Sequence, residues 1–447
     1  MAHIIFNKTL LCSFLGGMIS VSSLAQNMST PSKNASVSST NAEEIQAKVY
    51  TLEQCVNEAV SNNLKLRNAD KQILMSEEQR KEAYTKYFPT ISASGLGYMS
   101  NKGLLQMDLG GMGMSLMKHG TTASVTAMQP LFAGGQIING NKLAKVGEDV
   151  SRLQRGLTEN EIRLNTENYY WQAVMLKEKL KTIDQVEKQL IEVKKDAQAA
   201  VDAGIRNRND VLQVNLRHNE TKTTKIQVEN ALQTVCDLLA QVMGHPNERI
   251  DVADLKEKID NPQQLFVAPE SALHQTNEYQ LLDKQVEAGQ LQYKLSVGKN
   301  LPSVAVGGGY VYNHLMDKSQ NNLVGMLTVS VPISSWWGGS HDMKRQKLQI
   351  ANALDDKQNQ SELLVIRMRK AWNDLCDAYQ QVAIAQESIA QSEENLRLNT
   401  DYYQAGTSTI SDVLDAQTLY QQSHDQYVES IAKYEVKKRE YLQATGR

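Results

Sequence analysis

Apolar and polar residues alternate along four short stretches of this chain, which form two widely separated pairs: residues 88–99 and 121–132, then residues 301–313 and 321–333. In the second pair the apolar side chains share one face of each stretch. These side chains are Val304, Val306, Tyr310 and Tyr312, and then Leu323, Leu327, Val329 and Val331. Each stretch has about 10 to 12 residues, the length of a tilted strand that crosses a bilayer. The pattern therefore predicts two membrane-crossing β-hairpins.

Aromatic residues stand at both ends of the predicted strands. Phe88, Phe132, Trp336 and Trp337 lie where strands meet helices, and Tyr98, Tyr310 and Tyr312 lie toward the opposite ends. Two such girdles are typical of strands whose ends lie at the two surfaces of a membrane. The alternative is a soluble hairpin packed on helices, which would place these aromatic rings in its core.

Four strands are too few to close a barrel, because single-chain barrels begin at about eight strands. An open edge in lipid would leave backbone groups without hydrogen bonds. The chain is therefore expected to oligomerise, with eight strands from two copies or twelve from three. A small eight-stranded barrel is filled by its own side chains, so a conducting pore favours three copies.

Long helices account for most of the remaining chain. Residues 138–203 and 340–404 contain no proline, and each span would extend on the order of 100 Å at 1.5 Å per residue. In the second span, two rows recur at every seventh position, the pattern of a coiled-coil seam. The rows are Leu375, Val382, Ile389, Leu396 and Tyr403, and the smaller Ala371, Ala378, Ala385, Ser392 and Asn399. The first span has the same period at Ile183, Val186, Leu190, Val193, Ala197 and Ala200.

The end of each long helix is repeated in the sequence. Gly204 and Gly406 are 202 residues apart, and so are Asp210 and Asp412. Glycine can take the left-handed conformation that ends a helix, and the polar residues after each glycine suit the start of another. Each repeat is therefore predicted to run as helix, β-hairpin, long helix, sharp turn and returning helix.

Composition and charge narrow the function. The chain has 8 Pro and 5 Phe in 447 residues, which suits long helices better than compact domains. Its formal net charge of −3 provides no basic surface for nucleic acid. No HExxH, GxSxG or phosphate-loop motif is present, so neither an enzyme nor a nucleotide cofactor is predicted. Cys55, Cys236 and Cys376 are scattered and are expected to be buried apolar residues rather than ligands of a metal.

The first residues have the layout of a cleavable secretory signal: Lys8, an apolar run over residues 10–21, then Ser23 and Ala25. We expect a signal peptide at residues 1–25 and a flexible linker, rich in Ser, Asn and Thr, at residues 26–49. No later run of 18 or more apolar residues predicts a transmembrane helix. The first repeat is expected at residues 50–244, a segment between the repeats at 245–271, and the second repeat at 272–447.

These features resemble the TolC-like outer membrane efflux proteins over nearly the whole chain that follows the signal. The stretches that carry the resemblance are YTLEQCVNEAVSNNLKLRNADKQ (50–72), QPLFAGGQ (129–136) and YYQAGTSTISDVLDAQTLY (402–420). They look like the opening helix, the strand-to-helix junction, and the tip with its returning helix. The resemblance implies a mainly α-helical chain with a membrane β-barrel. A homotrimer closes twelve strands, four from each chain, above a long α-helical barrel made of both repeats.

The resemblance also implies a function. Such a protein lies in the bacterial outer membrane, in contact with its lipid, and extends into the periplasm. It passively exports drugs, small toxic molecules, peptides or proteins by docking to a periplasmic adaptor, or membrane fusion protein, and to an RND, ABC or MFS pump in the inner membrane. No cofactor and no nucleic-acid partner are expected.

Four residues of the two turns match positions that form the channel gate in this family. Asp412 and Asp415 match acidic residues that narrow the channel at its tip, and Asp210 matches the partner turn. Tyr403 matches a position that can hold the tip closed. The alternative for Asp412 and Asp415 is a local role at the start of their own helix, where the helix macrodipole stabilises a carboxylate.

One position departs from the family pattern. Ser408 stands where some members place an arginine that ties the inner hairpin down, and Arg206 and Arg208 of the other turn are candidates to replace it. The adaptor is expected to dock on both turns, at Gly204, Asn207, Gly406 and Ser408.

Two other functions stay open. The segment between the first two strands contains Met107, Met112, Met114, Met117 and His119. Soft ligands of this kind suit Cu(I) or Ag(I), which would make the chain a metal-ion efflux channel. A flexible, glycine-rich outer loop that uses methionine as apolar filler is the alternative. A periplasmic coiled-coil scaffold or adaptor is the remaining class.

Overall fold

The computed structural model describes residues 48–102, 105–109, 112–116, 118–255, 259–315 and 318–447. The predicted signal peptide and all but the last two residues of the predicted linker lie outside these residues. Lys48 and Val49, which close the predicted linker, belong to a short strand.

Two very long helices dominate the described chain, as the heptad pattern predicts. α3 (Gln136–Asp202) has 67 residues and α7 (Ser335–Gln404) has 70. Each is followed by a turn and a returning helix, α4 (Arg208–Val242) or α8 (Ile410–Ala444). Shorter helices precede the strands: α1 (Leu52–Asn62), α2 (Leu64–Thr85) and α6 (Asn277–Lys299). No helix in the described ranges combines the length and the apolar character needed to cross a membrane.

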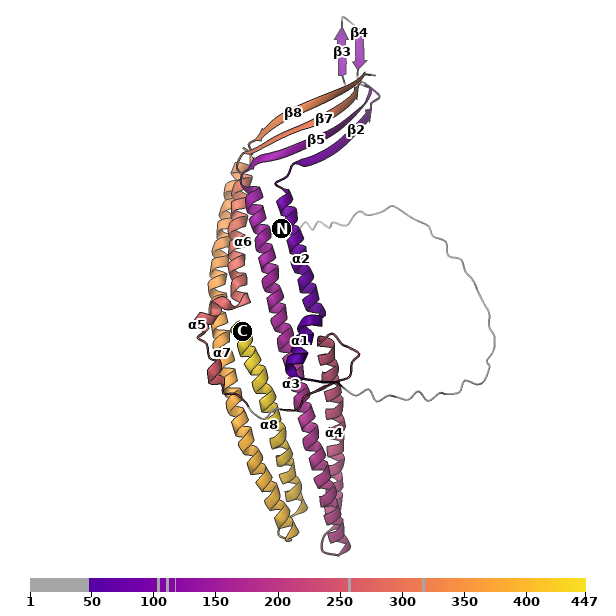
Figure 1. Cartoon of the computed structure of the whole chain (residues 1–447), viewed down its shortest axis with the longest axis vertical. Coiled ribbons are helices and arrows are strands. Elements are labelled where there is room, and N and C mark those ends of the chain that lie inside the picture. The colour runs from indigo at the N-terminus through magenta and orange to yellow at the C-terminus, as the bar shows by residue number, and fades with distance from the viewer. Residues whose placement is uncertain (1–47, 103–104, 110–111, 117, 256–258, 316–317) are drawn as a thin grey trace, which may run out of the picture. The chain divides into compact units, whose positions relative to one another are not determined.

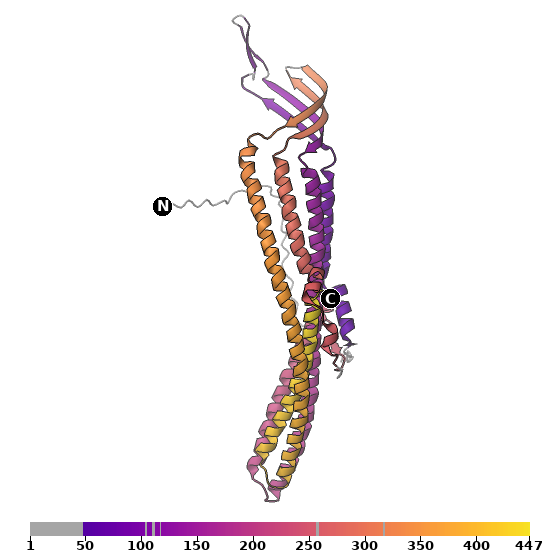
Figure 2. The same cartoon turned by 90° about the vertical axis from the view of Figure 1, so that its left-hand side faces the viewer.

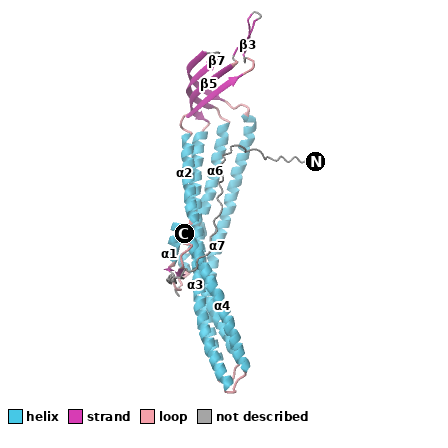
Figure 3. Cartoon of the chain, turned by 90° about the vertical axis from the view of Figure 1, so that its right-hand side faces the viewer, coloured by secondary structure: helices cyan, strands magenta, loops and turns pink. Residues whose placement is uncertain are grey.

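Both predicted hairpins form, and they join into one antiparallel sheet. Its strands are β2 (Thr90–Met99), β5 (His119–Ala133), β7 (Ser303–Leu315) and β8 (Lys318–Ser330), in the order β2-β5-β7-β8. The β5–β7 pair therefore joins the first repeat to the second. The strands lie at one end of the helices and the two turns at the other (Figure 1, Figure 2). The predicted order of elements in each repeat is confirmed (Figure 3).

A further hairpin was not predicted. β3 (Leu105–Leu109) pairs antiparallel with β4 (Met112–Leu116), and Met107 lies opposite Met114. We expected a flexible, glycine-rich outer loop here, whereas residues 105–109 and 112–116 form paired strands. Two short runs separated by Gly-Gly are a recognised hairpin signal, because glycine suits the turn. Met117 lies outside the described residues, and the hypothesis of copper or silver export stays a prediction.

More than half of the predicted seam residues are buried between helices, and the others are partly buried. Val186 and Leu190 of α3 are fully buried against Ile410 and Val413 of α8, close to the turns. Farther from the turns, Leu375, Ala378 and Val382 of α7 pack against Ile431, Tyr434 and Tyr441 of α8. The small residues of the seam let the helix axes approach, and the larger ones fill the space between them.

The segment between the repeats packs on both of them, through Ile250 and Val252 on the first repeat and through its later residues on the second. It contains the strand β6 (Ile250–Val252), which pairs in parallel with β1 (Lys48–Tyr50), and the short helices η1 (Pro262–Leu265), α5 (Pro269–Ala272) and η2 (Leu273–Gln275). Tyr434 donates a 2.6 Å hydrogen bond to the Asp260 carbonyl oxygen, and the Phe266 ring packs on Trp372 with centroids 4.9 Å apart.

A contact between two backbones joins the repeats just below the sheet. Gly134, in the turn between β5 and α3, has φ of 59°. A Cβ atom placed on it would lie 2.2 Å from the Gly298 carbonyl oxygen, and a Cβ placed on Gly298 would lie 2.5 Å from the Gly134 carbonyl oxygen. No other residue fits this pair without moving the backbone. The glycines of QPLFAGGQ thus serve a contact with α6 as well as a turn.

We expect Gly298→Ala to destabilise the protein by about 1–3 kcal/mol, because its methyl group must displace backbone. Gly140→Ala, on α3, is the matched control. A Cβ there meets nothing within 4 Å, so alanine should stabilise the helix by about 0.5–1 kcal/mol. The temperature at which the folded band is lost in heat-modifiability gels would measure both changes. Equal temperatures for wild type and Gly298→Ala would contradict the close contact.

Candidate functional sites

The two faces of the four-stranded sheet differ in chemistry. One face has paired hydroxyl groups, with 2.9 Å between the Ser92 and Thr126 oxygens and 2.8 Å between those of Ser94 and Ser124. The opposite face is apolar and exposed. It includes Ile91, Val125, Val306, Tyr310, Leu323, Leu327 and Val329. An apolar face of this size indicates contact with a membrane or with another protein.

The aromatic residues predicted as membrane girdles occupy different environments. Phe88 and Phe132 are about half exposed, and the Trp337 side chain is 79% exposed. The Trp336 indole N–H donates a 2.9 Å hydrogen bond to the Asn300 carbonyl oxygen. These four residues stand at the helix end of the sheet, and their role as a membrane girdle stays a prediction.

The tyrosines of the other predicted girdle do not share one face. Tyr310 and Tyr312 lie at apolar-face positions, and together with Ala123 and Val125 they line a shallow hollow. Tyr98 is an even number of residues from Ser92 and Ser94 in the same strand. Its side chain therefore lies on the face with the paired hydroxyl groups, the hydroxyl face. The sequence pattern did not assign Tyr98 to a face, because alternation in its strand is imperfect.

At the other end of the helices, the two turns have the same backbone geometry. Gly204 has φ of 73° and Gly406 has φ of 80°. After each glycine an amide donates a 2.9 Å hydrogen bond to a carbonyl of the helix that is ending: Ile205 to Ala200, and Thr407 to Tyr402. A Cβ on either glycine would meet nothing within 4 Å, so both turns are open to solvent in the chain.

Asp412 caps its own helix. Its Oδ2 accepts hydrogen bonds from the Thr409 amide (2.8 Å), the Thr409 hydroxyl (2.7 Å) and the Ser408 hydroxyl (2.9 Å). The Thr409 hydroxyl, the Thr409 amide and the Ser408 hydroxyl, in that order, lower the pKa of Asp412 below its usual value. Asp412 therefore has the local role at the start of its own helix, and Ser408 contributes a hydrogen bond to this cap. Asp415, three residues on, is exposed and accepts no hydrogen bond from the described residues.

Tyr403 is held by the first turn. The Arg206 guanidinium lies over the Tyr403 ring, 4.6 Å from its centroid, and donates a 2.9 Å hydrogen bond to the Tyr403 carbonyl oxygen. The Tyr403 hydroxyl is 3.5 Å from Oδ2 of Asp210. Burial, and then the Asp210 charge, raise the pKa of Tyr403. We call Arg206, Tyr403 and Asp210 the tip latch, because these side chains connect the first hairpin to the end of α7.

One acidic residue of the helical region was not found from the sequence. Asp425 of α8 faces Lys179 of α3, which also pairs with Glu429. Its Oδ1 is buried without a hydrogen-bond partner among the described residues. Burial raises the pKa of Asp425 to about 6, although Lys179 opposes the rise and Glu429 adds to it. No local motif marks this position, because its burial depends on the packing of α8 against α3.

Asp425 should make the folded protein less stable as the pH rises. Its folded pKa lies above the usual 3.8, so its contribution is fully favourable below about pH 4 and is lost as the pH passes 6. We expect Asp425→Asn to increase the free energy of unfolding at pH 7.5 by about 1 kcal/mol per chain, after allowance for solvent screening, and so to raise the unfolding temperature. Near pH 4 the variant should match wild type. Asp237→Asn, at an exposed site on α4, should give no pH-dependent difference. Parallel pH profiles for wild type and Asp425→Asn would contradict the raised pKa.

The fold and its two end sites describe an elongated helical protein with a sheet suited to a membrane, which is the architecture of an outer membrane channel. The sequence matches the outer membrane efflux protein family over residues 55–245 and 268–446. The chain therefore belongs to this family. The two matched ranges correspond closely to the two repeats, and no curated protein sequence matches the chain at a significant level.

Solved structures with the same fold are similar over most of their length. The outer-membrane channel OprN is 14% identical, with a TM-score of 0.77, and the match covers 88% of this chain and 89% of OprN. VceC from Vibrio cholerae is 12% identical, with a TM-score of 0.76 and coverage of 88% and 96%. The Campylobacter jejuni CmeC channel is 15% identical, with a TM-score of 0.73 and coverage of 94% of each chain.

The family and the fold define what the chain is. It is an outer membrane efflux channel of a tripartite system, not an enzyme, and it extends from the outer membrane into the periplasm. Channels of this type are trimers in which four strands from each chain form a twelve-stranded barrel. The soluble-hairpin and periplasmic-scaffold alternatives are therefore wrong.

Proposed function

We propose that this chain is a gated exit duct that receives its substrates at the helical tip from a periplasmic adaptor and an inner-membrane pump of the RND, ABC or MFS type. The observation that carries the proposal is the tip latch, since it ties together two hairpins that would have to separate for the tip to widen. The apolar face of the sheet would contact the lipid of the outer membrane through its girdle residues.

The two turns are the proposed docking surface for the adaptor. Gly204 and Gly406 provide the same backbone shape twice in each chain, and so six times around a trimer. Repetition of one shape suits an adaptor whose own copies surround the tip. Asn207 and Ser408 give the two turns different chemistry. The first turn also exposes Ile205 to 75%, an apolar side chain that a docked partner would bury.

The tip latch holds the resting state in this proposal. Arg206 performs from the first turn the role that an arginine at position 408 has in some family members, since Ser408 is engaged with Asp412. A charge-assisted hydrogen bond and a cation–π contact on one tyrosine together contribute about 2 kcal/mol per chain. Asp210 contributes less, because 3.5 Å is long for a hydrogen bond.

We expect Arg206→Ala to increase the open probability of single channels in planar bilayers by about tenfold or more, because the closed state loses the latch in every chain. Arg208→Ala is the matched control. It removes the same charge from the same turn, and Arg208 is exposed and has no ion pair with any described residue. Arg208→Ala should conduct as wild type does. If both variants open equally, net charge rather than the latch controls the tip.

Asp415 is the proposed acidic residue of the narrowed tip. Its carboxylate is exposed and uncapped, whereas Asp412 is fixed to Thr409 and Ser408. Three copies of Asp415 around a channel axis would repel one another and attract cations, divalent cations most strongly.

We expect Asp415→Asn to reduce cation selectivity and divalent-cation block several-fold in bilayer recordings, since it removes charge that no neighbour neutralises. Asp412→Asn should change the block less and should lower the unfolding temperature, because the amide weakens the helix cap. The reverse order of effects on the block would assign the gate to Asp412 instead.

A further inference from the structure

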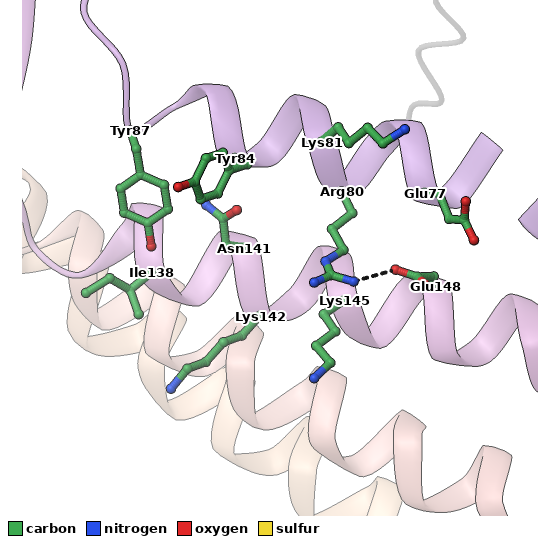
Figure 4. Close-up of a pocket in the computed structure, with 10 residues that line it drawn as sticks. All are labelled: Glu77, Arg80, Lys81, Tyr84, Tyr87, Ile138, Asn141, Lys142, Lys145 and Glu148. Atoms are coloured by element: carbon green, nitrogen blue, oxygen red, sulfur yellow. Dashed lines mark hydrogen bonds and ion pairs between the residues drawn. The ribbon is translucent and has the colours of Figure 1, made fainter. Parts of the chain in front are cut away.

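A pocket of about 690 Å³ lies between α2 and α3, next to the sheet (Figure 4). This volume is within the range of roughly 300–1,000 Å³ that is usual for small-ligand sites. One end of the pocket is lined by aromatic and apolar side chains and the other by basic ones. Tyr84, Tyr87 and Ile138 line the end nearest the strands, and Lys142 and Lys145 extend from α3 farther along (Figure 4).

The lysines are the unpaired charges of this pocket. Every other charged residue of the lining has an ion-pair partner: Arg80 with Glu148 at 2.9 Å, Lys81 with Glu78 at 2.7 Å, and Glu77 with Arg152 at 2.6 Å. Lys142 and Lys145 make no ion pair within the described part of the chain, and their spacing of three residues places them on one side of α3. The pocket therefore has a surplus of two positive charges.

The pocket lies on the same side of the molecule as the apolar face of the sheet. A second hollow between the same helices is lined by Thr90 and Pro130, which occupy hydroxyl-face positions of their strands. On α2, Lys81 and Tyr84 line the first hollow, whereas Glu82 lines the second. The two hollows therefore open on opposite sides of the α2–α3 layer. The lysine pocket therefore opens on the same side as the apolar face of the sheet.

The distance of the two lysines from the strands suits a position at the membrane surface. α3 begins at Gln136, directly after the strand, so Lys142 and Lys145 stand about 9 and 14 Å along the helix. Their flexible stems let the ammonium groups reach back toward the strands. Tyrosine is enriched where a membrane meets water, because its ring is apolar and its hydroxyl is polar. Tyr84 and Tyr87 are in this position.

We propose that this pocket binds the phosphate-bearing headgroup of an anionic glycerophospholipid in the leaflet that faces the periplasm. The Lys142 and Lys145 ammonium groups donate hydrogen bonds to the phosphate oxygens. Tyr84, Tyr87 and Ile138 contact the glycerol and the first methylene groups. Basic pockets at this level of a membrane protein recognise anionic headgroups in this way. The proposal rests on the membrane location and is independent of the tip latch.

Native mass spectrometry of the purified trimer tests it, in detergent that contains equal amounts of phosphatidylglycerol and phosphatidylcholine. Wild type is expected to retain phosphatidylglycerol in preference to phosphatidylcholine. Lys142→Gln/Lys145→Gln should lower the retention of phosphatidylglycerol about tenfold, because two cations near the surface are lost. Its retention of phosphatidylcholine should not change. Lys142→Arg/Lys145→Arg, which keeps both charges, should restore the preference.

Lys194→Gln/Lys195→Gln is the matched control. It makes the same change of charge on α3 at two exposed residues without ion pairs in the described chain, far from the sheet. This control should retain lipid as wild type does, and heat-modifiable trimers in every variant would establish correct folding. Equal lipid retention in wild type and in a folded Lys142→Gln/Lys145→Gln would overturn the proposal, as would equal loss in the control. Lysine-dependent binding of inorganic phosphate to delipidated protein, without any lipid preference, would reassign the pocket to a free anion.

Discussion

The unpaired backbone of the two edge strands is the constraint on which this structure depends. β2 and β8 have no partner on their outer edges within the described chain, and lipid offers no hydrogen bonds to replace one. One chain is therefore an incomplete wall, and three copies close it into the twelve-stranded barrel of the family. The same constraint acts on α2, α3, α6 and α7, because each adjoins a strand that the barrel holds in place. The apolar exposed face and the hydroxyl-paired face then follow from the position of the sheet between lipid and channel.

Duplication provides the two halves, and small differences between them give the two turns different contacts. The turns at Gly204 and Gly406 have the same backbone geometry. Arg206 in the first turn reaches over Tyr403, whereas Ser408 in the second caps its own helix through Asp412.

Local features of this protein were largely predictable. Hydrophobic periodicity located α3, α7 and all four strands of the main sheet. The spacing of apolar residues in the sequence follows the geometric repeat of a helix or a strand. The β3–β4 hairpin was missed although its runs alternate, because each run is only five residues long. The candidate gate was only partly predictable. Asp412 lies beside the second turn and its role in the gate stays a prediction, while its hydrogen bonds to Thr409 and Ser408 depend on side-chain geometry that spacing alone does not reveal.

The sequence by itself determined the two repeats, the length of their helices, the glycine turns and the alternation of the strands, because each depends on residues that are close together in the chain. The tertiary structure alone decided which side chains meet. Arg206 and Tyr403 are 197 residues apart, and Asp425 is buried only because α8 packs against α3. The lysine pocket exists only because α2 and α3 lie side by side. Contacts of this kind depend on how distant segments pack, which no local pattern records.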